Sequence, residues 1–304
     1  MNLLYITLTK HNKLVSGGAE LERLRGLAKK FNYVHIVCRG SSLCFYEDLV
    51  IEGVSLLDMN RYCTKLSPKF DWVMAGSLNL DGLIAVQTKN KTCIRCGGEY
   101  NYKNLLKDGL SKLVQKKVLS KVDRLVVNSY YLQNKLGGFV VHNGVNLRKF
   151  SPRSKVPKYS GKGVYLGRVR KDKGVDIINR INHETNHRID IISGVPHDKV
   201  PRILKEYDFL ILPSTSTSSE SLPNVLLEAM ACGVPCIASN IAGISEILPD
   251  EALFEENNFE DIRDHLFKLQ DKDFRDYLVK EGFKVAKAHN ITKMNKELYK
   301  GLFK

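Results

Sequence analysis

The clearest structural pattern in the sequence is ESLPNVLLEAMACGVPCIAS, residues 220–239. It follows a strand-like run that ends near Leu212 and a loop rich in serine and threonine. The pattern predicts a helix that begins near Pro223 or Asn224 and breaks at residues 233–235, before a further strand. A strand, a loop, a helix and a second strand in this order are typical of a parallel α/β sheet.

Two glutamates in this stretch need a chemical explanation. Glu220 lies in the loop, and Glu228 lies about a turn inside the predicted helix. The first helical N–H groups, those of Asn224, Val225 and Leu226, have no intrahelical partner and would face a phosphate. In open parallel sheets, ligands bind at the carboxyl ends of the strands, so both glutamates can face one crevice there. Beside a bound phosphate, a carboxylate would accept hydrogen bonds from sugar hydroxyls.

The remaining sequence repeats this alternation in two halves. Strand-like runs such as LLYITL, YVHIVCR and DRLVVNS occupy the first half, and GVYLGRV, RIDIISG and DFLILPS occupy the second. Between them lies KFSPRSKVPKYSGKG, which is rich in Pro, Ser and Lys and poor in apolar residues. We therefore predict Rossmann-like domains over residues 1–155 and 156–288, with a final helix over 289–304 that crosses back to the first domain.

Composition limits the class of protein. The 304 residues are 43% hydrophobic, and no run approaches the ~20 apolar residues of a membrane-spanning helix. The opening MNLLYITLTK is typical of a first strand and not of a signal peptide. Seven cysteines is an odd number, and their spacing is not that of a disulfide framework. These features favour a soluble protein of the reducing cytoplasm.

The charge is unevenly distributed. Residues 1–155 carry 25 Lys and Arg against 11 Asp and Glu, whereas residues 156–304 carry 22 of each. This asymmetry suggests that the first half meets a polyanion, such as anionic lipid headgroups, a phosphorylated acceptor or nucleic acid, or that its basic surface is merely solubilising. Six lysines between Lys103 and Lys121 surround an apolar stripe of leucine and valine. We expect the stripe to pack on the first sheet while the lysines face solvent or an anionic membrane.

Two further motifs combine glycine with basic residues. Gly17 and Gly18 precede a predicted helix after the first strand, a pattern that lets backbone approach an anion. YLGRVRKDKGVD places Arg168 and Lys173 between a predicted strand and a helix. An arginine fork and a mobile lysine at that point can hold a diphosphate between them.

Taken together, these motifs resemble the large family 4 of retaining glycosyltransferases, the glycosyl transferases group 1. SGGAE resembles the amino-terminal glycine loop, HNGVNLRKF the NGVD…F signature, and YLGRVRKDKGVD the GR…KG motif of that family. ESLPNVLLEAMACGVPCIAS is similar to its E-x7-E motif. The resemblance covers nearly the whole chain and implies the GT-B architecture, two Rossmann-like domains facing across a cleft.

The resemblance also implies roles for individual residues. Arg168 and Lys173 would grip the donor diphosphate, Glu220 would bind hydroxyls of the transferred sugar, and Glu228 would bind the nucleotide ribose. Gly194, in IISGVPHDKVPRIL, would belong to the nucleotide-binding turn, although this segment is shorter than is usual in the family.

The chain departs from the family pattern at two further places. The family's active-site histidine is absent from TCIRCGGEYNY, where Arg95 or Glu99 could take its role. Ser221, Leu222 and Pro223 follow the first glutamate in place of the commoner Gly-Phe-Gly.

We therefore expect a retaining, metal-independent hexosyltransferase of polysaccharide or glycolipid biosynthesis. It would use a UDP or GDP sugar as co-substrate, without a cofactor, and a glycan or lipid-linked acceptor. We expect it to be cytoplasmic, with peripheral attachment to the membrane, and to bind no nucleic acid. The alternative is a basic lipid- or nucleic-acid-binding protein on a catalytically inactive scaffold.

Overall fold

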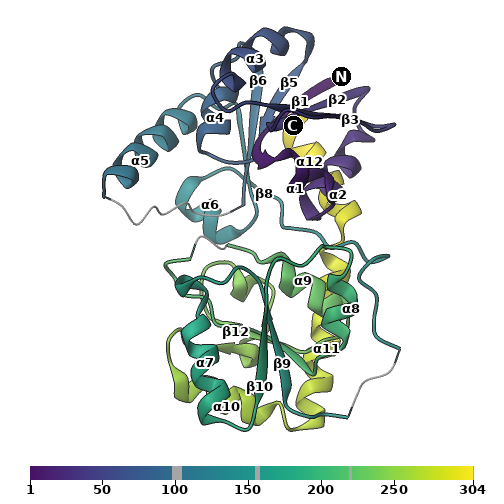
Figure 1. The fold of residues 1–304 in the computed structure, drawn as a ribbon, viewed down its shortest axis with the longest axis vertical. Coiled ribbons are helices and arrows are strands. Elements are labelled where there is room, and N and C mark those ends of the chain that lie inside the picture. Colours follow the sequence, from purple (N-terminus) through teal and green to yellow (C-terminus); the bar gives the residue numbers. More distant parts are fainter. Residues whose placement is uncertain (98–104, 155–157, 219–220, 304) are drawn as a thin grey trace. The chain divides into compact units, whose positions relative to one another are not determined.

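The computed structural model describes residues 1–97, 105–154, 158–218 and 221–303, which form two compact units (Figure 1). Unit 1 comprises Met1–His142 and Met294–Lys304, and unit 2 comprises Asn143–Lys293. The division falls earlier than the predicted boundary after residue 155. The reason is that residues beyond 142 already bond within unit 2: the Asn143 side chain donates to the Leu222 carbonyl at 2.6 Å.

Unit 1 is built on an eight-stranded sheet with the order β3-β4-β2-β1-β5-β6-β7-β8. All neighbouring strands are parallel except the edge pair of β3 and β4, which is antiparallel. Central strand β1 is buried, as expected for a strand covered on both faces. The strands are β1 (Asn2–Lys10), β2 (Tyr33–Arg39), β3 (Leu43–Phe45), β4 (Val50–Val54), β5 (Trp72–Ala75), β6 (Lys91–Cys96), β7 (Arg124–Val127) and β8 (Phe139–Val140).

Helices connect and cover the strands of unit 1. The last helix, α12 (Ile291–Phe303), also contacts this unit: Asn295 lies against Gly26, and the Tyr299 ring lies 5.8 Å from the Phe31 ring. The other helices are α1 (His11–Val15), α2 (Ala19–Ala28), α3 (Met59–Leu66), η1 (Ser67–Lys69), α4 (Leu80–Ala85), α5 (Leu105–Leu119) and α6 (Tyr130–Leu136).

Unit 2 is built on a five-stranded sheet with the order β10-β9-β11-β12-β13, in which every neighbouring pair is parallel. Their carboxyl ends therefore share one edge of the sheet. The four residues of β11 are all buried and apolar, as in a strand covered on both faces. The strands are β9 (Lys162–Leu166), β10 (Arg188–Ile192), β11 (Phe209–Leu212), β12 (Cys236–Ser239) and β13 (Leu253–Phe254).

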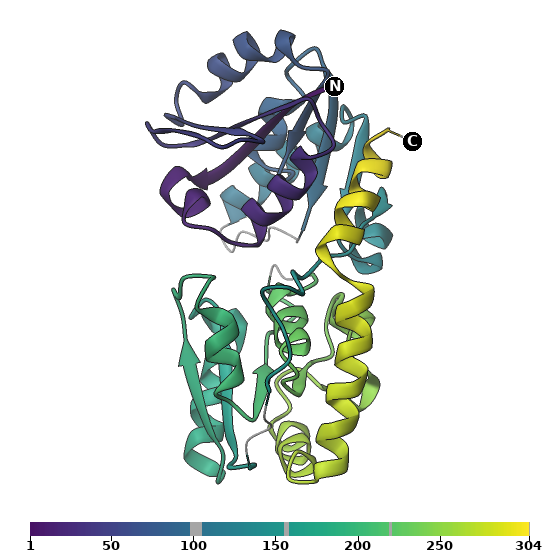
Figure 2. The same cartoon turned by 90° about the vertical axis from the view of Figure 1, so that its right-hand side faces the viewer.

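The helices of unit 2 begin at recognisable caps and pack on this sheet. Asn258 and Asp271 accept backbone N–H groups at the starts of α10 and α11. Helix α11 runs beside α9, where Gly282 admits the Met230 side chain (Figure 2). The elements are η2 (Lys171–Lys173), α7 (Val175–Glu184), α8 (Val200–Lys205), α9 (Asn224–Ala231), η3 (Ile244–Glu246), η4 (Asp250–Ala252), α10 (Phe259–Lys268) and α11 (Lys272–Ala288). The predicted α/β class with parallel sheets is confirmed.

Candidate functional site

The loop that follows β9 carries both basic residues of the predicted diphosphate site. Arg168 is exposed, its carbonyl accepts the Tyr165 hydroxyl at 2.8 Å, and its guanidinium makes no hydrogen bond or ion pair within the described residues. Lys173 is buried, with 2% of its surface exposed. Arg168 therefore offers an available fork and Lys173 a buried cation at the carboxyl end of β9.

At Gly174 the backbone of this loop lies in close contact with the loop that follows β11. Its φ is +70°, and a Cβ built there would lie 1.9 Å from the Pro213 carbonyl oxygen, so only glycine fits. The Asp172 carbonyl accepts the Thr215 N–H at 3.0 Å, and the Asp172 carboxylate takes both Nε and Nη2 of Arg170. The two loops are thus held together at the carboxyl edge of the sheet.

Helix α9 begins at the same edge, and among the described residues no side chain caps its amino terminus. Pro223 occupies the cap position, supplies no capping side chain, and is followed by a first turn without an acidic residue. Asn224 is exposed, Val225 is half-buried and Leu226 is buried. Their N–H groups precede the hydrogen-bonded ladder of the helix, so this terminus can accept an anion.

Two hydrogen bonds in series, which the sequence did not predict, hold the Glu228 side chain in place. Its carboxylate is buried, and its Oε1 lies 2.8 Å from Nε2 of His197, whose Nδ1 lies 2.7 Å from Nζ of Lys149. Because an ammonium group can only donate, Nδ1 of His197 accepts and its Nε2–H donates to Glu228. The sequence shows His197 three positions after Gly194. No local pattern indicates that its side chain would hydrogen-bond to Glu228, which lies in another segment.

Gly194 lies after β10 at the same edge. Its φ is +71°, and a Cβ there would meet no atom within 4 Å, so the backbone faces open space. Glu220 lies outside the described residues. The structure therefore brings Arg168, Lys173, Gly194 and Glu228 to one edge of the sheet, while the role of Glu220 remains a prediction.

The glycine loop of unit 1 is also open. Gly17 and Gly18 have positive φ values, and neither has an atom near its Cβ direction. Just after them, the Glu20 carboxylate accepts the hydroxyls of Tyr5, Thr7 and Thr9 at 2.9 to 3.1 Å, which fixes the start of α2 to β1.

The residues proposed to replace the missing histidine are only partly described. Arg95 is buried in unit 1; its burial and, second, the positive charge of Arg23 together lower the pKa of its guanidinium to about 9. Glu99 lies outside the described residues. Neither assignment is tested by this geometry.

The predicted packing of the α5 stripe is wrong at its exposed end. Leu110 and Leu113 are 65% and 66% exposed, whereas Val114 of the same predicted stripe is half-buried and packs against the core of unit 1. Figure 1 shows the cause, since the amino-terminal half of α5 projects away from the body of unit 1. Lys112 and Lys116 are exposed beside these leucines.

Metal-ligating clusters and membrane-spanning helices are both absent from the described residues. No group of three or more His, Cys, Asp or Glu residues there is placed to hold a metal ion. Likewise, none of the helices in the described ranges has the length and apolar character that crossing a bilayer demands.

Comparison with known proteins places these features in context. Residues 179–285 match the family model described as Glycosyl transferases group 1. An uncharacterized glycosyltransferase of Methanocaldococcus jannaschii is 25% identical over 205 residues, which is 56% of each chain. The phosphatidylinositol N-acetylglucosaminyltransferase GPI3 subunit of Saccharomyces cerevisiae is 24% identical over 37% of this chain and 32% of its own. The matches thus span about half of the archaeal relative and a third of the yeast one.

Solved structures share the fold over nearly the whole chain. Sucrose-phosphate synthase from Thermosynechococcus elongatus aligns with a TM-score of 0.81 and 16% identity, covering 100% of this chain and 99% of that one. Anabaena Alr3699/HepE in complex with UDP and glucose aligns with a TM-score of 0.79 and 15% identity, covering 99% of each. The predicted fold, two Rossmann-like units of the GT-B type, is confirmed.

Proposed function

We propose that this protein is a glycosyltransferase that moves a hexose-type sugar from a UDP or GDP sugar to a hydroxyl group of an acceptor. The observation that carries the proposal is the carboxyl edge of the unit 2 sheet. Arg168, Lys173 and the uncapped terminus of α9 suit a diphosphate, and Glu228 suits the two hydroxyls of a ribose. The match of residues 179–285 to the group 1 family supports the same assignment.

The proposed catalytic roles follow from the negative charge that develops on the leaving nucleotide diphosphate. When the sugar–oxygen bond breaks, the nucleotide diphosphate gains negative charge, which the Lys173 cation, the Arg168 fork and the α9 N–H groups would stabilise. Preorganised donors of this kind lower the activation barrier more than most other catalytic effects do. The fork and the buried cation serve the purpose that a metal ion serves in other transferases, so we propose a metal-independent reaction.

The stereochemical outcome is a separate proposal. The family resemblance favours retention by front-face attack, in which the leaving phosphate takes the acceptor proton. An inverted anomeric centre in the product, detected by NMR, would contradict retention without affecting the transferase assignment. Full turnover in excess EDTA is expected; activity that returns only with added Mg²⁺ or Mn²⁺ would contradict metal independence.

The donor can be identified with a panel of UDP and GDP sugars. We expect one of them to be hydrolysed slowly, or transferred to a glycan acceptor, with release of UDP or GDP. The alternative function, a binding protein without catalysis, is not favoured because residues 179–285 match a family model of glycosyl transferases. It would gain support if no nucleotide sugar bound.

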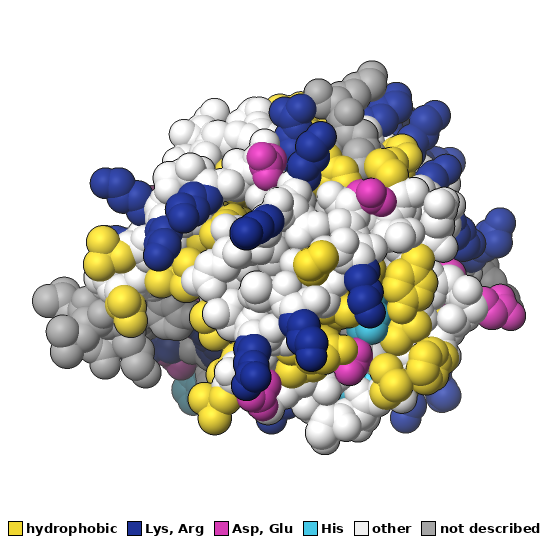
Figure 3. All heavy atoms as spheres, turned by 90° about the horizontal axis from the view of Figure 1, so that it is seen from above, with side chains coloured by type: hydrophobic (Ala, Val, Ile, Leu, Met, Phe, Trp, Pro, Cys, Tyr) yellow, Lys and Arg dark blue, Asp and Glu magenta, His cyan; other side chains and the backbone are white. Residues whose placement is uncertain are grey.

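We further propose that the acceptor is lipid-linked and that α5 attaches unit 1 to an anionic membrane. Leu110 and Leu113 are exposed beside Lys112, Lys116 and Lys117, so apolar and electrostatic attraction would act together. Each lysine near the surface contributes roughly 1 kcal/mol. Figure 3 shows a face of the molecule on which basic side chains far outnumber acidic ones.

Vesicle sedimentation tests the attachment. Binding to phosphatidylserine vesicles, and not to phosphatidylcholine vesicles, should weaken at least tenfold in Lys112→Gln/Lys116→Gln/Lys117→Gln and in Leu110→Ser/Leu113→Ser. The matched control, Lys29→Gln/Lys30→Gln/Lys65→Gln, removes the same charge from exposed positions of unit 1 outside α5. Equal binding by the α5 variants and the control would end the α5 hypothesis, and a soluble glycan acceptor would replace it.

A further inference from the structure

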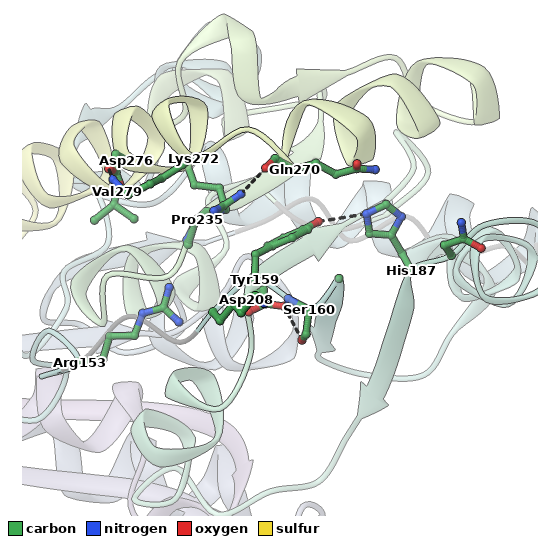
Figure 4. A pocket seen from close by; sticks show the side chains of 14 residues that line it. Arg153, Tyr159, Ser160, His187, Asp208, Pro235, Gln270, Lys272, Asp276 and Val279 are labelled. Atoms are coloured by element: carbon green, nitrogen blue, oxygen red, sulfur yellow. Dashed lines mark hydrogen bonds and ion pairs between the residues drawn. The ribbon is translucent and has the colours of Figure 1, made fainter.

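A hollow lies in unit 2, at the end of the sheet opposite the candidate donor site, and Figure 4 shows the side chains that line it. Its volume is about 1070 Å³, which is large enough for a small-molecule ligand. The segments that line it come directly before β9, β10, β11 and β12, whereas the donor-site loops follow these strands. A strand of five residues spans about 16 Å, so the two sites are separate.

The first notable group in the hollow is the Arg153 guanidinium. Its Nη1 donates to the Tyr207 carbonyl at 2.9 Å, while its Nε is buried and has no hydrogen-bond partner among the described residues. Within the described residues, no carboxylate lies at ion-pair distance from it. Burial lowers the pKa of Arg153, the negative charge of Asp208 raises it, and the positive charge of Arg275 lowers it, so the two guanidinium groups are close enough to repel.

Arg275 is likewise held by neutral groups. Its Nη1 donates to the Leu269 and Gln270 carbonyls at 2.6 and 2.9 Å, and its guanidinium carbon lies 4.5 Å from the centre of the Tyr159 ring. These contacts fix the plane of the guanidinium without neutralising its charge. Within the described residues its Nε and Nη2 donate no hydrogen bond, so they can serve a ligand.

The acidic residues that line the hollow are already occupied. Oδ2 of Asp208 accepts the Ser160 N–H, the Ser160 hydroxyl and the Lys162 N–H at 2.8 to 3.0 Å. Asp276 pairs with Lys272 at 2.5 Å. In the part of the chain that the structure describes, neither carboxylate forms an ion pair with Arg153 or Arg275, and Asp208 attracts Arg153 only from beyond ion-pair distance.

We propose that this hollow binds a small molecule that carries a phosphate monoester. Two guanidinium groups that lack carboxylate partners provide the planar donors that phosphate oxygens accept. The hydroxyl of Tyr159, which lies 3.0 Å from Nε2 of His187, supplies a further polar group beside them. The volume of the hollow exceeds that of phosphate alone, so the ligand carries an organic part. This site is independent of the proposed transferase activity.

Two-dimensional ¹H–¹⁵N NMR with inorganic phosphate tests the proposal, because it reports the two sites separately. Phosphate should shift the amide signals of Ser160, Gly161 and His187, which mark the hollow. Shifts at Asn224 and Val225 would report the donor site instead. An absence of shifts at the three hollow residues overturns the proposal, whatever happens at α9.

Variants assign the binding to the arginines. Arg153→Gln and Arg275→Gln should each weaken the phosphate affinity measured at the hollow at least tenfold. Arg263→Gln, an exposed arginine on α10 paired with Glu260, is the matched control and should leave it unchanged. Because Arg275 also holds the end of α10, Arg275→Lys, which keeps the charge and loses the fork, provides a second variant. Equal affinity in all variants contradicts the assignment.

The same variants distinguish the two sources of such a phosphate. Vesicles of phosphatidic acid carry a phosphate monoester on a lipid, and vesicles of phosphatidylcholine do not. Binding to phosphatidic acid that is lost in Arg153→Gln and displaced by free phosphate identifies a lipid headgroup. Phosphate binding at the hollow without such vesicle binding identifies a soluble phosphate ester.

Discussion

Replacing Glu228 by glutamine should weaken binding of the nucleotide diphosphate on the order of 10²-fold. In the structure the carboxylate is buried and receives one N–H from His197, which leaves its other lone pairs for a ligand. A hydrogen bond to a charged group contributes about 1.5–3 kcal/mol. Weakening the hydrogen bonds from two ribose hydroxyls to the Glu228 carboxylate therefore reduces the binding free energy by about 3 kcal/mol. Each 1.4 kcal/mol is a factor of ten in affinity.

Substitutions of His197 should weaken nucleotide binding by smaller amounts than Glu228→Gln does. His197→Ala keeps the Glu228 charge but removes the donor that orients it, which should cost about 1 kcal/mol, or roughly fivefold in affinity. His197→Gln supplies an amide N–H in the same region and should recover most of the loss. Glu206→Gln, which neutralises an exposed carboxylate, serves as the control.

Isothermal titration calorimetry with UDP or GDP, whichever binds, measures these affinities. The decisive comparison uses the 2′,3′-dideoxy form of the same nucleotide in a double-mutant cycle. Wild type should prefer the natural nucleotide, and Glu228→Gln should lose most of that preference. If the variant still discriminates between the two nucleotides as wild type does, Glu228 does not bind the ribose.

Two further predictions concern stability. Gly174→Ala should lower the free energy of unfolding of unit 2 by at least 2 kcal/mol, because a left-handed alanine costs about 1–2 kcal/mol and its Cβ would overlap the Pro213 carbonyl. Gly194 has nearly the same φ but lies in open space, so Gly194→Ala should lower the free energy of unfolding by the backbone strain alone. Equal losses of unfolding free energy in the two variants, measured by denaturant titration, would refute the packing explanation. In unit 1, burial raises the pKa of Asp81 to about 6, so the folded state is penalised above pH 6, and the penalty disappears as the pH falls to about 4. Asp81→Asn should therefore raise unfolding free energy by on the order of 1–3 kcal/mol at pH 8 and by little at pH 4, and a gain that does not depend on pH would contradict the assigned cause.

Local patterns in the sequence predicted the elements that carry the site. The run that ends at Leu212, the start of α9 at Asn224 and its end before Gly233 all agree with the structure. Proline, glycine and apolar periodicity act over a few residues, so one sequence is enough to read them.

Features that depend on tertiary contacts could not be read in this way. His197 and Glu228 are 31 positions apart, and only the folded sheet brings them to hydrogen-bond distance. The apolar periodicity of α5 is real, but the pattern does not say how far the underlying sheet extends, so the exposure of Leu110 and Leu113 was missed. The basic hollow collects side chains from five separate segments and leaves no local signature.

The central claim is that the carboxyl edge of unit 2 activates a nucleotide sugar. Its most direct test is the rate of UDP or GDP release from the preferred nucleotide sugar by wild type, Lys173→Ala and Lys171→Ala. Lys171 lies two positions away on the same short helix but is exposed, whereas Lys173 is buried. We expect a loss on the order of 10²-fold or more in Lys173→Ala and near-normal release in Lys171→Ala. Equal rates in wild type and Lys173→Ala, or no release from any nucleotide sugar, would contradict it.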